Sequence, residues 1–284
     1  MSSPLFDLGA EPDAQALPPI EAADRATLRV SGPVYCIPCD MVPEPAHSDP
    51  VWLRAVYRVL EVTFAAVVLA LSLPLLLLAA LLIRAESPGP ALFKHTRVGR
   101  SRRVLGAELK GRTDVVAPDG QFEDDRWYFV PTTFRLIKFR SMYIDAWQRF
   151  PEMFDVKYAS HDEFLNALQK TKDDPRITRV GAVLRKLTID ELPNMWSVIT
   201  GDIRLVGPRP EGLPFMPYYL PHEMVKFTVA PGVTGYQQTR GRANLTKGQT
   251  IECDLQYVHE RCVAVDLRVV ALTVWMVLLR RGAF

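Results

Sequence analysis

The longest apolar run in the chain extends from Val62 to Ile83 and contains no charged residue. As a straight helix it would be about 33 Å long, at about 1.5 Å per residue, which is enough to cross a bilayer. A buried core helix is the alternative. Pro74 lies near the middle of the run, where a proline removes a backbone hydrogen bond and predicts a kink or a break. The pattern predicts a membrane helix that either spans the bilayer or turns at Pro74 and leaves on the same side.

Positively charged residues flank this run on both sides. Arg54 and Arg58 precede it, and Arg84 and Lys94 follow it. Because cations favour the cytoplasmic side of a membrane, cations at both ends disfavour a spanning helix. The flanks therefore favour a re-entrant, proline-broken membrane helix within 51–86, with both ends in the cytoplasm.

A second apolar stretch, Val263–Leu279, is interrupted by Asp266 and Arg268. Its charge-free part, Val269–Leu279, is too short to span a bilayer. The stretch therefore predicts a core helix or an interfacial helix.

The region between the two apolar stretches mixes strand and helix patterns. The alternation in Phe134–Arg140 predicts a strand with Lys138 and Arg140 on one face, and Asp162–Gln169 predicts a short helix. We expect an α+β fold, in which a membrane-associated globular domain carries an N-terminal re-entrant helix. Residues 1–50 are expected to form a flexible proline-rich leader with one extended stretch at Leu28–Ile37. Residues 51–86 form the membrane helix, and residues 87–284 form a cytosolic domain.

Composition narrows the class of protein. The chain has 284 residues, of which 34 are Lys or Arg and 32 are Asp or Glu, so that the net charge is +2. This balance argues against a dedicated nucleic-acid binder, which normally shows a basic excess. A hydrophobic share of 48% is high for a soluble protein and low for a polytopic one, and it fits one membrane segment on a globular body.

The densest chemical signal is Thr188–Pro193, in which two acidic residues are adjacent. Thr188 and Glu191 have the spacing of a capping box, but a helix begun at Thr188 would place Pro193 where a backbone hydrogen bond is lost. Asp190 is therefore expected to be the N-cap or to lie close to it, and the positive end of the helix would keep its carboxylate ionised near neutral pH. Asp190 could serve only as a cap. Alternatively, one carboxylate could attack phosphorus while the other binds Mg²⁺.

Arginine and lysine recur beside turn-forming residues. The arginine side chain presents a planar fork that matches phosphate oxygens, and Gly and Pro fix the backbone so that such groups converge. A solvated surface is the alternative explanation for any single cluster. The four clusters are Arg97–Arg100, Lys138–Arg140, Gly207–Pro210 and Arg240–Arg242.

A series of short motifs runs from the apolar segment to the end of the chain. They are Ser87–Pro90, Arg97–Arg100, Phe134–Met142, Asp174–Gly181, Leu184–Pro193, Gly201–Pro210, Pro231–Gly235, Gly241-Arg242 and Gly282-Ala-Phe. In this order they resemble the bacterial sugar transferases, the monotopic polyprenyl-phosphate phosphoglycosyl transferases that start capsule, exopolysaccharide and glycoconjugate assembly. The resemblance is interrupted at 101–133, where members of that family have only a few residues. This insert is either a surface excursion or a lid or partner surface.

The resemblance implies a ping-pong reaction in the domain 87–284. Asp190 would attack the sugar-proximal phosphorus of a UDP-sugar, UMP would leave, and an aspartyl-phosphosugar would form. Polyprenyl (undecaprenyl) phosphate would then accept the phosphosugar. Glu191 would bind the Mg²⁺ that the reaction requires. Asp254 and Asp266 fall on acidic positions of the C-terminal motif and are candidate active-site acids.

The resemblance also places cations around the acidic pair. Lys138 and Arg242 fall on family positions that neutralise phosphate oxygens, and Arg140 and Arg209 are expected as further phosphate contacts. Such cations suit phosphoryl transfer, which depends mainly on positioning and charge stabilisation.

The membrane helix departs from the family pattern at its kink. The family has Ser immediately before the hairpin proline, whereas here Leu73 precedes Pro74 and Ser72 stands one position earlier. The Ser72 hydroxyl is expected to satisfy a carbonyl that Pro74 leaves free.

The implied setting is the cytoplasmic face of a bacterial inner membrane, with the protein monotopic. The expected partners are a UDP-sugar donor, a polyprenyl phosphate acceptor, inner-membrane lipids and a second copy of the chain in a homodimer, with no nucleic acid. Two rival interpretations are a membrane-anchored, non-catalytic scaffold of a glycan assembly complex and a transferase in which Asp190 is only a base or a metal ligand. The sequence specifies neither the sugar nor the glycan.

Overall fold

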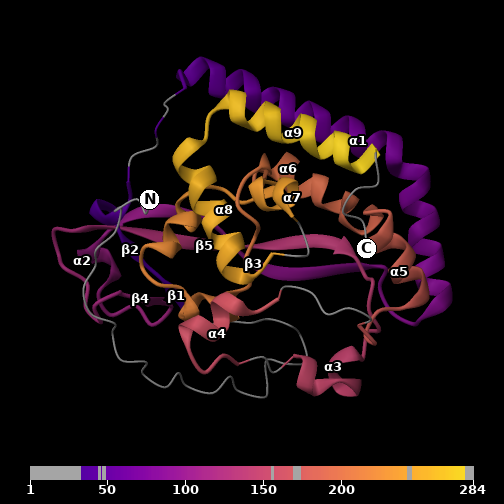
Figure 1. The fold of residues 1–284 in the computed structure, drawn as a ribbon, viewed down its shortest axis with the longest axis horizontal. Helices are drawn as coiled ribbons and strands as arrows, with labels where there is room; N and C mark the ends of the chain where they lie inside the picture. Colours follow the sequence, from indigo (N-terminus) through magenta and orange to yellow (C-terminus); the bar gives the residue numbers. More distant parts are fainter. Residues whose placement is uncertain are drawn as a thin grey trace, which may run out of the picture.

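A long antiparallel hairpin forms the centre of the protein (Figure 1). In the computed structural model, β3 (Leu92–Leu105) pairs with β5 (Trp127–Phe139), and the register shifts between Val98 and Ser101. β2 (Ile37–Pro38) adds a third strand beside β5. The structure describes residues 33–43, 46, 49–154, 157–168, 174–241 and 245–278.

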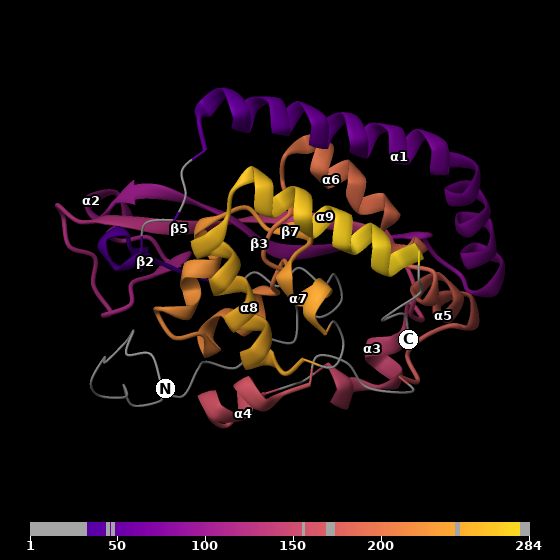
Figure 2. The same ribbon diagram turned by 45° about the horizontal axis from the view of Figure 1, so that its top comes forward.

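Helices cover both sides of this hairpin and, with it, confirm the predicted α+β class. Figures 1 and 2 show α1 and α9 on one side and α3 and α4 on the other. The α-helices are α1 (Val51–Glu86), α2 (Gly106–Leu109), α3 (Ala146–Arg149), α4 (His161–Asn166), α5 (Arg179–Lys186), α6 (Met195–Thr200), α7 (Tyr236–Arg240), α8 (Lys247–Glu260) and α9 (Val263–Leu278). The remaining elements are the short strands β1 (Val34–Tyr35), β4 (Val115–Val116), β6 (Arg204–Val206) and β7 (Gly232–Thr234) and the 3₁₀ helices η2 (Cys39–Met41), η3 (Pro151–Met153), η4 (Ile189–Asn194), η5 (Leu213–Tyr218) and η6 (Glu223–Thr228).

The apolar run forms one continuous helix, α1, with Pro74 inside it. Figures 1 and 2 show that this helix bends. The predicted kink is therefore confirmed, whereas the prediction that Pro74 breaks the helix is wrong. Both halves of α1 are held by packing, because Ala65 lies in a cluster with Val198 of α6 and Ile83 in another with Phe139 of β5. Only 11% of the most apolar window of α1 is buried, whereas a core helix would be mostly covered. The exposed apolar surface therefore indicates membrane association.

Ser72 does not act as predicted at the bend. Its hydroxyl donates to the carbonyl of Leu69 at 3.3 Å. The carbonyl that a proline at position 74 deprives of its usual partner is that of Ala70, four residues earlier. The hydroxyl therefore reaches one residue too far back along the helix.

The insert at 101–133 is built into the folded body. Its ends are the outer halves of β3 and β5, and Leu109 and Tyr128 lie in the same buried cluster as Ile37. Within the predicted leader, β1 pairs in parallel with β4 of the insert. The predicted extended stretch at Leu28–Ile37 overlaps these strands, and its first residues lie outside the described part of the chain.

The second apolar stretch forms α9, which lies beside α1 in both views (Figures 1 and 2). Val269 on α9 is 2% exposed, whereas Trp275 is 60% exposed. One face of α9 therefore packs on the core, and the other continues the exposed apolar surface of α1.

Candidate active site

The two adjacent carboxylates lie in η4, between α5 and α6. Asp190 and Glu191 are the second and third residues of this 3₁₀ helix. Thr188 precedes it with a φ of 58°, a left-handed conformation that a β-branched residue rarely adopts, and so turns the chain sharply after α5. Asp190 was predicted to be the N-cap or to lie close to it. Thr188 occupies the cap position, and Asp190 lies two residues after it in the first turn. Pro193 is tolerated because η4 ends at Asn194 and α6 begins as a new helix.

Lys138 approaches the carboxylate pair from β5. It is paired with Phe93 of β3, so its side chain shares a sheet face with those of His95 and Arg97. The charges of Asp190 and Glu191 both favour the protonated form of Lys138, which places the three groups in one electrostatic centre. Burial is the larger effect and lowers the pKa of Lys138 to about 8, with Arg97 and Arg185 acting in the same direction.

Asp190 is buried, and its ionised form is disfavoured by its surroundings. Burial raises its pKa, the charge of Glu191 raises it further, and Lys138 and Arg185 lower it. The net shift is upward, opposite to the direction predicted from a helix N-terminus. A carboxylate in this environment gains from any cation or electrophile that takes up its charge.

Arg185 and Arg97 belong to the site. The sequence placed Arg97 in a candidate phosphate-binding cluster but assigned no role to Arg185. The Arg185 Nε donates to the Ser141 hydroxyl at 2.9 Å. Gly181 makes this approach of α5 feasible, because a Cβ there would lie 2.1 Å from the carbonyl oxygen of Ser141. Both arginines lie within motifs that the sequence analysis identified, but the sequence did not show that they come together with the acidic pair.

His95 joins the same centre as a neutral side chain. Burial lowers its pKa to about 3, and the positive charges of Arg97 and Lys138 lower it as well. The imidazole therefore adds a hydrogen-bonding group to this face of the hairpin without adding charge.

Arg140, a predicted phosphate contact, holds the end of α1. Its guanidinium donates to the carbonyls of Pro88 at 2.6 Å and of Ser87 at 2.9 Å. Glu86, the last residue of α1, accepts the backbone N–H groups of Arg179 and Val180 at the start of α5. These bonds fix the end of α1 next to α5, the helix that carries Arg185.

The structure places Arg209 on the exposed rim between two polar centres. Its positive charge lowers the pKa of Arg97 and of Lys247. Its backbone N–H donates a hydrogen bond to the Asp254 carboxylate. Arg242, the other predicted phosphate contact from the C-terminal half, lies outside the described residues.

Asp254 belongs to a second, largely buried charge network, which is coupled to the first because Glu211 acts on His95 and Arg97. It is paired with Lys226 at 2.7 Å, and both side chains are 1% exposed. Lys247 pairs with Glu211 in the same network, and Glu211 also accepts a hydrogen bond from Tyr219 at 2.6 Å. Burial raises the pKa of Asp254, whereas Lys226 lowers it. The network holds the backbone at Arg209 in place through Asp254.

Asp266 lies in a third polar centre, beneath α1. It accepts a hydrogen bond from Tyr257 at 2.8 Å, and burial raises its pKa to about 7. Glu61 of α1, which is also buried, pairs with Arg204 of β6 at 2.5 Å in the same region. The acids of the C-terminal motif are therefore not grouped with Asp190; one supports the core and the other faces the membrane helix.

The acidic pair suits a magnesium ion chemically. Within the described ranges, no group of three or more His, Cys, Asp or Glu side chains could hold a metal ion. Mg²⁺, however, is typically bound by one or two carboxylates together with water and substrate phosphates. The repulsion by Glu191 that raises the pKa of Asp190 supports this fit, because a divalent cation would offset it.

Comparisons with known proteins identify the family of the chain. The family model described as bacterial sugar transferase matches residues 52–128 and 119–280. The chain is 33% identical over 196 residues to the galactosyl transferase CpsE of Streptococcus agalactiae, covering 69% of this chain but only 36% of that protein. It is 34% identical over 235 residues to the UDP-glucose:undecaprenyl-phosphate glucose-1-phosphate transferase of Caulobacter vibrioides, covering 80% of this chain and 71% of that protein.

A third relative is matched over most of its length. The exopolysaccharide production protein ExoY of Rhizobium meliloti is 31% identical over 227 residues, covering 80% of this chain and 87% of that protein. The chain thus spans about a third of CpsE and most of the other two relatives. By the family model and by these relatives, the chain belongs to the bacterial sugar transferase family.

Proposed function

We propose that the protein transfers a sugar-1-phosphate from a UDP-sugar to polyprenyl phosphate and releases UMP, as the first step in assembling a polysaccharide or glycoconjugate. The observation that carries this proposal is the acidic pair Asp190 and Glu191 facing Lys138 and Arg185 in one centre. The name of the Caulobacter relative, a glucose-1-phosphate transferase acting on undecaprenyl phosphate, supports the class of reaction. The name of CpsE, a galactosyl transferase, leaves the sugar open.

In the first step, a carboxylate oxygen of Asp190 attacks the phosphorus that bears the sugar. The bond from this phosphorus to the bridging oxygen breaks, and the electron pair leaves with UMP. Burial and the charge of Glu191 make the Asp190 carboxylate a better nucleophile than a solvated one. Lys138 and Arg185 neutralise charge on the phosphate oxygens.

In the second step, an oxygen of polyprenyl phosphate attacks the same phosphorus. The acyl-phosphate bond breaks, which restores the Asp190 carboxylate and gives a polyprenyl diphospho-sugar. Glu191 would hold Mg²⁺, which, when bound, neutralises charge on the diphosphate. The reaction needs no further reactant.

The covalent step can be tested by intact mass. Purified full-length protein with Mg²⁺ and a panel of UDP-sugars, without acceptor, is expected to gain the mass of one phosphosugar and release UMP. The gain should map to Asp190 and identify the donor sugar. UMP release that requires acceptor, with no adduct, would instead indicate direct transfer. No UMP with any donor, even with polyprenyl phosphate present, would favour the scaffold interpretation.

We further propose that α1 is re-entrant and that the body lies on the cytoplasmic face of the inner membrane. Near its start, Arg58 donates to the Val198 carbonyl at 2.6 Å, and at its end Glu86 binds the start of α5. A helix whose two ends bind the same globular body supports entry and exit on one side. The homodimer stays a prediction from the sequence.

Cysteine labelling tests this topology. In a chain whose native cysteines are replaced by serine, Val51→Cys and Lys110→Cys place thiols at exposed positions near α1 and in the insert. Neither is expected to react with a membrane-impermeant maleimide in intact cells, and both should react after lysis. Labelling of position 51 alone in intact cells would indicate a spanning helix.

A further inference from the structure

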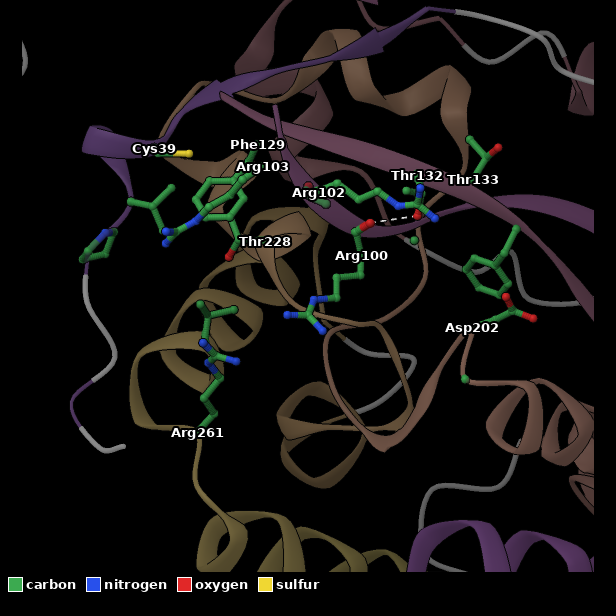
Figure 3. A pocket seen from close by; sticks show the side chains of 17 residues that line it. Cys39, Arg100, Arg102, Arg103, Phe129, Thr132, Thr133, Asp202, Thr228 and Arg261 are labelled. Carbon is green, nitrogen blue, oxygen red and sulfur yellow. Dashed lines mark hydrogen bonds between the residues drawn. The ribbon is translucent and has the colours of Figure 1, made fainter. Parts of the chain in front are cut away.

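A hollow lies along the outer half of the hairpin, and the acidic pair is not part of its wall. It has a volume of about 1030 Å³, and its walls come from β3, β5, the segment after β2 and the C-terminal end of α8 (Figure 3). Among the described residues, its wall contains Arg100, from the candidate phosphate-binding cluster Arg97–Arg100, but neither the acidic pair nor Lys138, Arg140 or Arg209. Lys138 lies about 13 Å further along β5 than Phe134, a residue of the hollow's wall. We call this hollow the basic groove.

Four arginines converge on the basic groove. Arg100, Arg102 and Arg103 come from β3 and Arg261 from the end of α8, and Figure 3 shows all four around the hollow. Among the described residues, no carboxylate forms an ion pair with any of these four side chains. Asp202 is the acidic residue in the wall, and its carboxylate accepts a hydrogen bond from Thr200 at 2.7 Å. The wall of the groove therefore carries an excess of positive charge, with four arginines and one acidic residue.

The cations are held together despite their mutual repulsion. Burial lowers the pKa of Arg261, Tyr257 and Asp266 raise it, and the nearby charges of Arg100 and Arg54 lower it, with a net shift downward. Arg103 lies over the ring of Phe129 at 5.2 Å, and the Thr132 hydroxyl donates to the Arg100 carbonyl at 2.8 Å. Like charges kept close by a folded frame favour binding of an anion, and the guanidinium fork fits phosphate oxygens in particular.

One wall of the groove lies near the starts of the two apolar helices. Arg261 directly precedes α9, whose first residue, Val263, donates its N–H to Asp49 at 2.8 Å. α1 starts two residues after Asp49, and Trp52 in its first turn is 67% exposed. Arginines beside the ends of exposed apolar helices lie at the depth of lipid headgroups when those helices rest in a membrane.

We propose that the basic groove is a second anion site, separate from Asp190, that binds the phosphate ester of an anionic phospholipid headgroup. Its phosphate would be bound by Arg103 and Arg261 from opposite walls. The lipid source rests on the proposed membrane placement of α1. A soluble phosphate compound offers the same chemistry, and the experiment separates the two.

The test compares two variants that lose the same charge. Arg103→Gln/Arg261→Gln removes two cations from the groove, and Lys110→Gln/Arg112→Gln removes two exposed cations elsewhere in the insert, so both lower the net charge from +2 to 0. Full-length protein in dodecyl maltoside with EDTA is titrated calorimetrically with dioctanoyl phosphatidylglycerol. The groove variant is expected to bind about tenfold more weakly or worse. The control variant should match the wild type.

Two further ligands identify the source of the phosphate. Dioctanoyl phosphatidylcholine, which has no net charge, should bind more weakly than phosphatidylglycerol to the wild type. Inorganic pyrophosphate should fail to displace phosphatidylglycerol; displacement would overturn the lipid source in favour of a soluble phosphate. Equal phosphatidylglycerol binding by the wild type and the groove variant would overturn the site itself.

The result does not depend on catalysis. A protein that releases no UMP yet binds phosphatidylglycerol through the groove would contradict the proposed reaction and support the groove. If circular dichroism shows that the double variant is misfolded, the single variant Arg102→Gln replaces it, because this exposed side chain takes part in no described hydrogen bond. The affinity of this single variant for phosphatidylglycerol is then expected to fall as well, but by a smaller factor.

Discussion

Asp190→Asn is expected to lower the rate of UMP release by about a thousandfold or more, because an amide cannot attack phosphorus as a carboxylate does. Asn has nearly the same shape, so Lys138 and Arg185 should keep their places. The variant should also be at least as stable as the wild type, since burial and the charge of Glu191 already disfavour the ionised Asp190. UMP release with acceptor present and thermal denaturation of the same samples measure both effects.

The exposed carboxylate of Asp124 offers a matched control. Its side chain is 59% exposed in the insert, so Asp124→Asn makes the same chemical change without touching the acidic pair. This control should keep wild-type turnover. Turnover of Asp190→Asn within tenfold of the wild type would show that Asp190 is not the nucleophile. If Asp190→Asn loses all turnover but the wild type forms no phosphosugar adduct, Asp190 would instead act as a base or a metal ligand.

Lys226→Met is expected to lower the free energy of unfolding by about 3–5 kcal/mol at neutral pH, because it leaves Asp254 buried without its cation. The neighbouring charge of Glu211 adds to the penalty. Loss of Lys226 raises the pKa of Asp254 further, and a carboxyl group with a raised pKa stabilises the fold once it is protonated. The deficit should therefore be smaller at pH 5 than at pH 7, as measured by denaturant unfolding of the full chain.

An exposed pair of the same length isolates the effect of burial. Lys110 and Asp124 are also 2.7 Å apart, but their side chains are 52% and 59% exposed. Lys110→Met should cost less than about 1 kcal/mol. Adding Asp254→Leu to Lys226→Met should recover much of the lost stability, because no unpaired charge then remains buried. A well-folded double variant without turnover would instead place Asp254 in the reaction, as the sequence motif predicts.

The sequence by itself determined the features that depend on local pattern and on motif order. The charge-free run from Val62 to Ile83 predicted a membrane helix. In the structure this run belongs to one long helix with an exposed apolar surface, as that prediction requires. The alternation in Phe134–Arg140 predicted the inner half of β5, and the helix predicted at Asp162–Gln169 is found as α4. The ordered motifs indicated the family, which the family model confirms. These inferences hold because periodicity and motif spacing are properties of consecutive residues.

Only the tertiary structure decided which charged residues act together. Lys138 and Arg140 are two positions apart, yet Lys138 shares a centre with Asp190 while Arg140 holds the end of α1. Asp254 and Asp266 share one motif but lie in different polar centres. The turn at Thr188, the contribution of Arg97 and Arg185 and the basic groove likewise depend on segments distant in sequence. The physical reason is that burial and charge interactions are set by neighbours in space, which no spacing along the chain specifies.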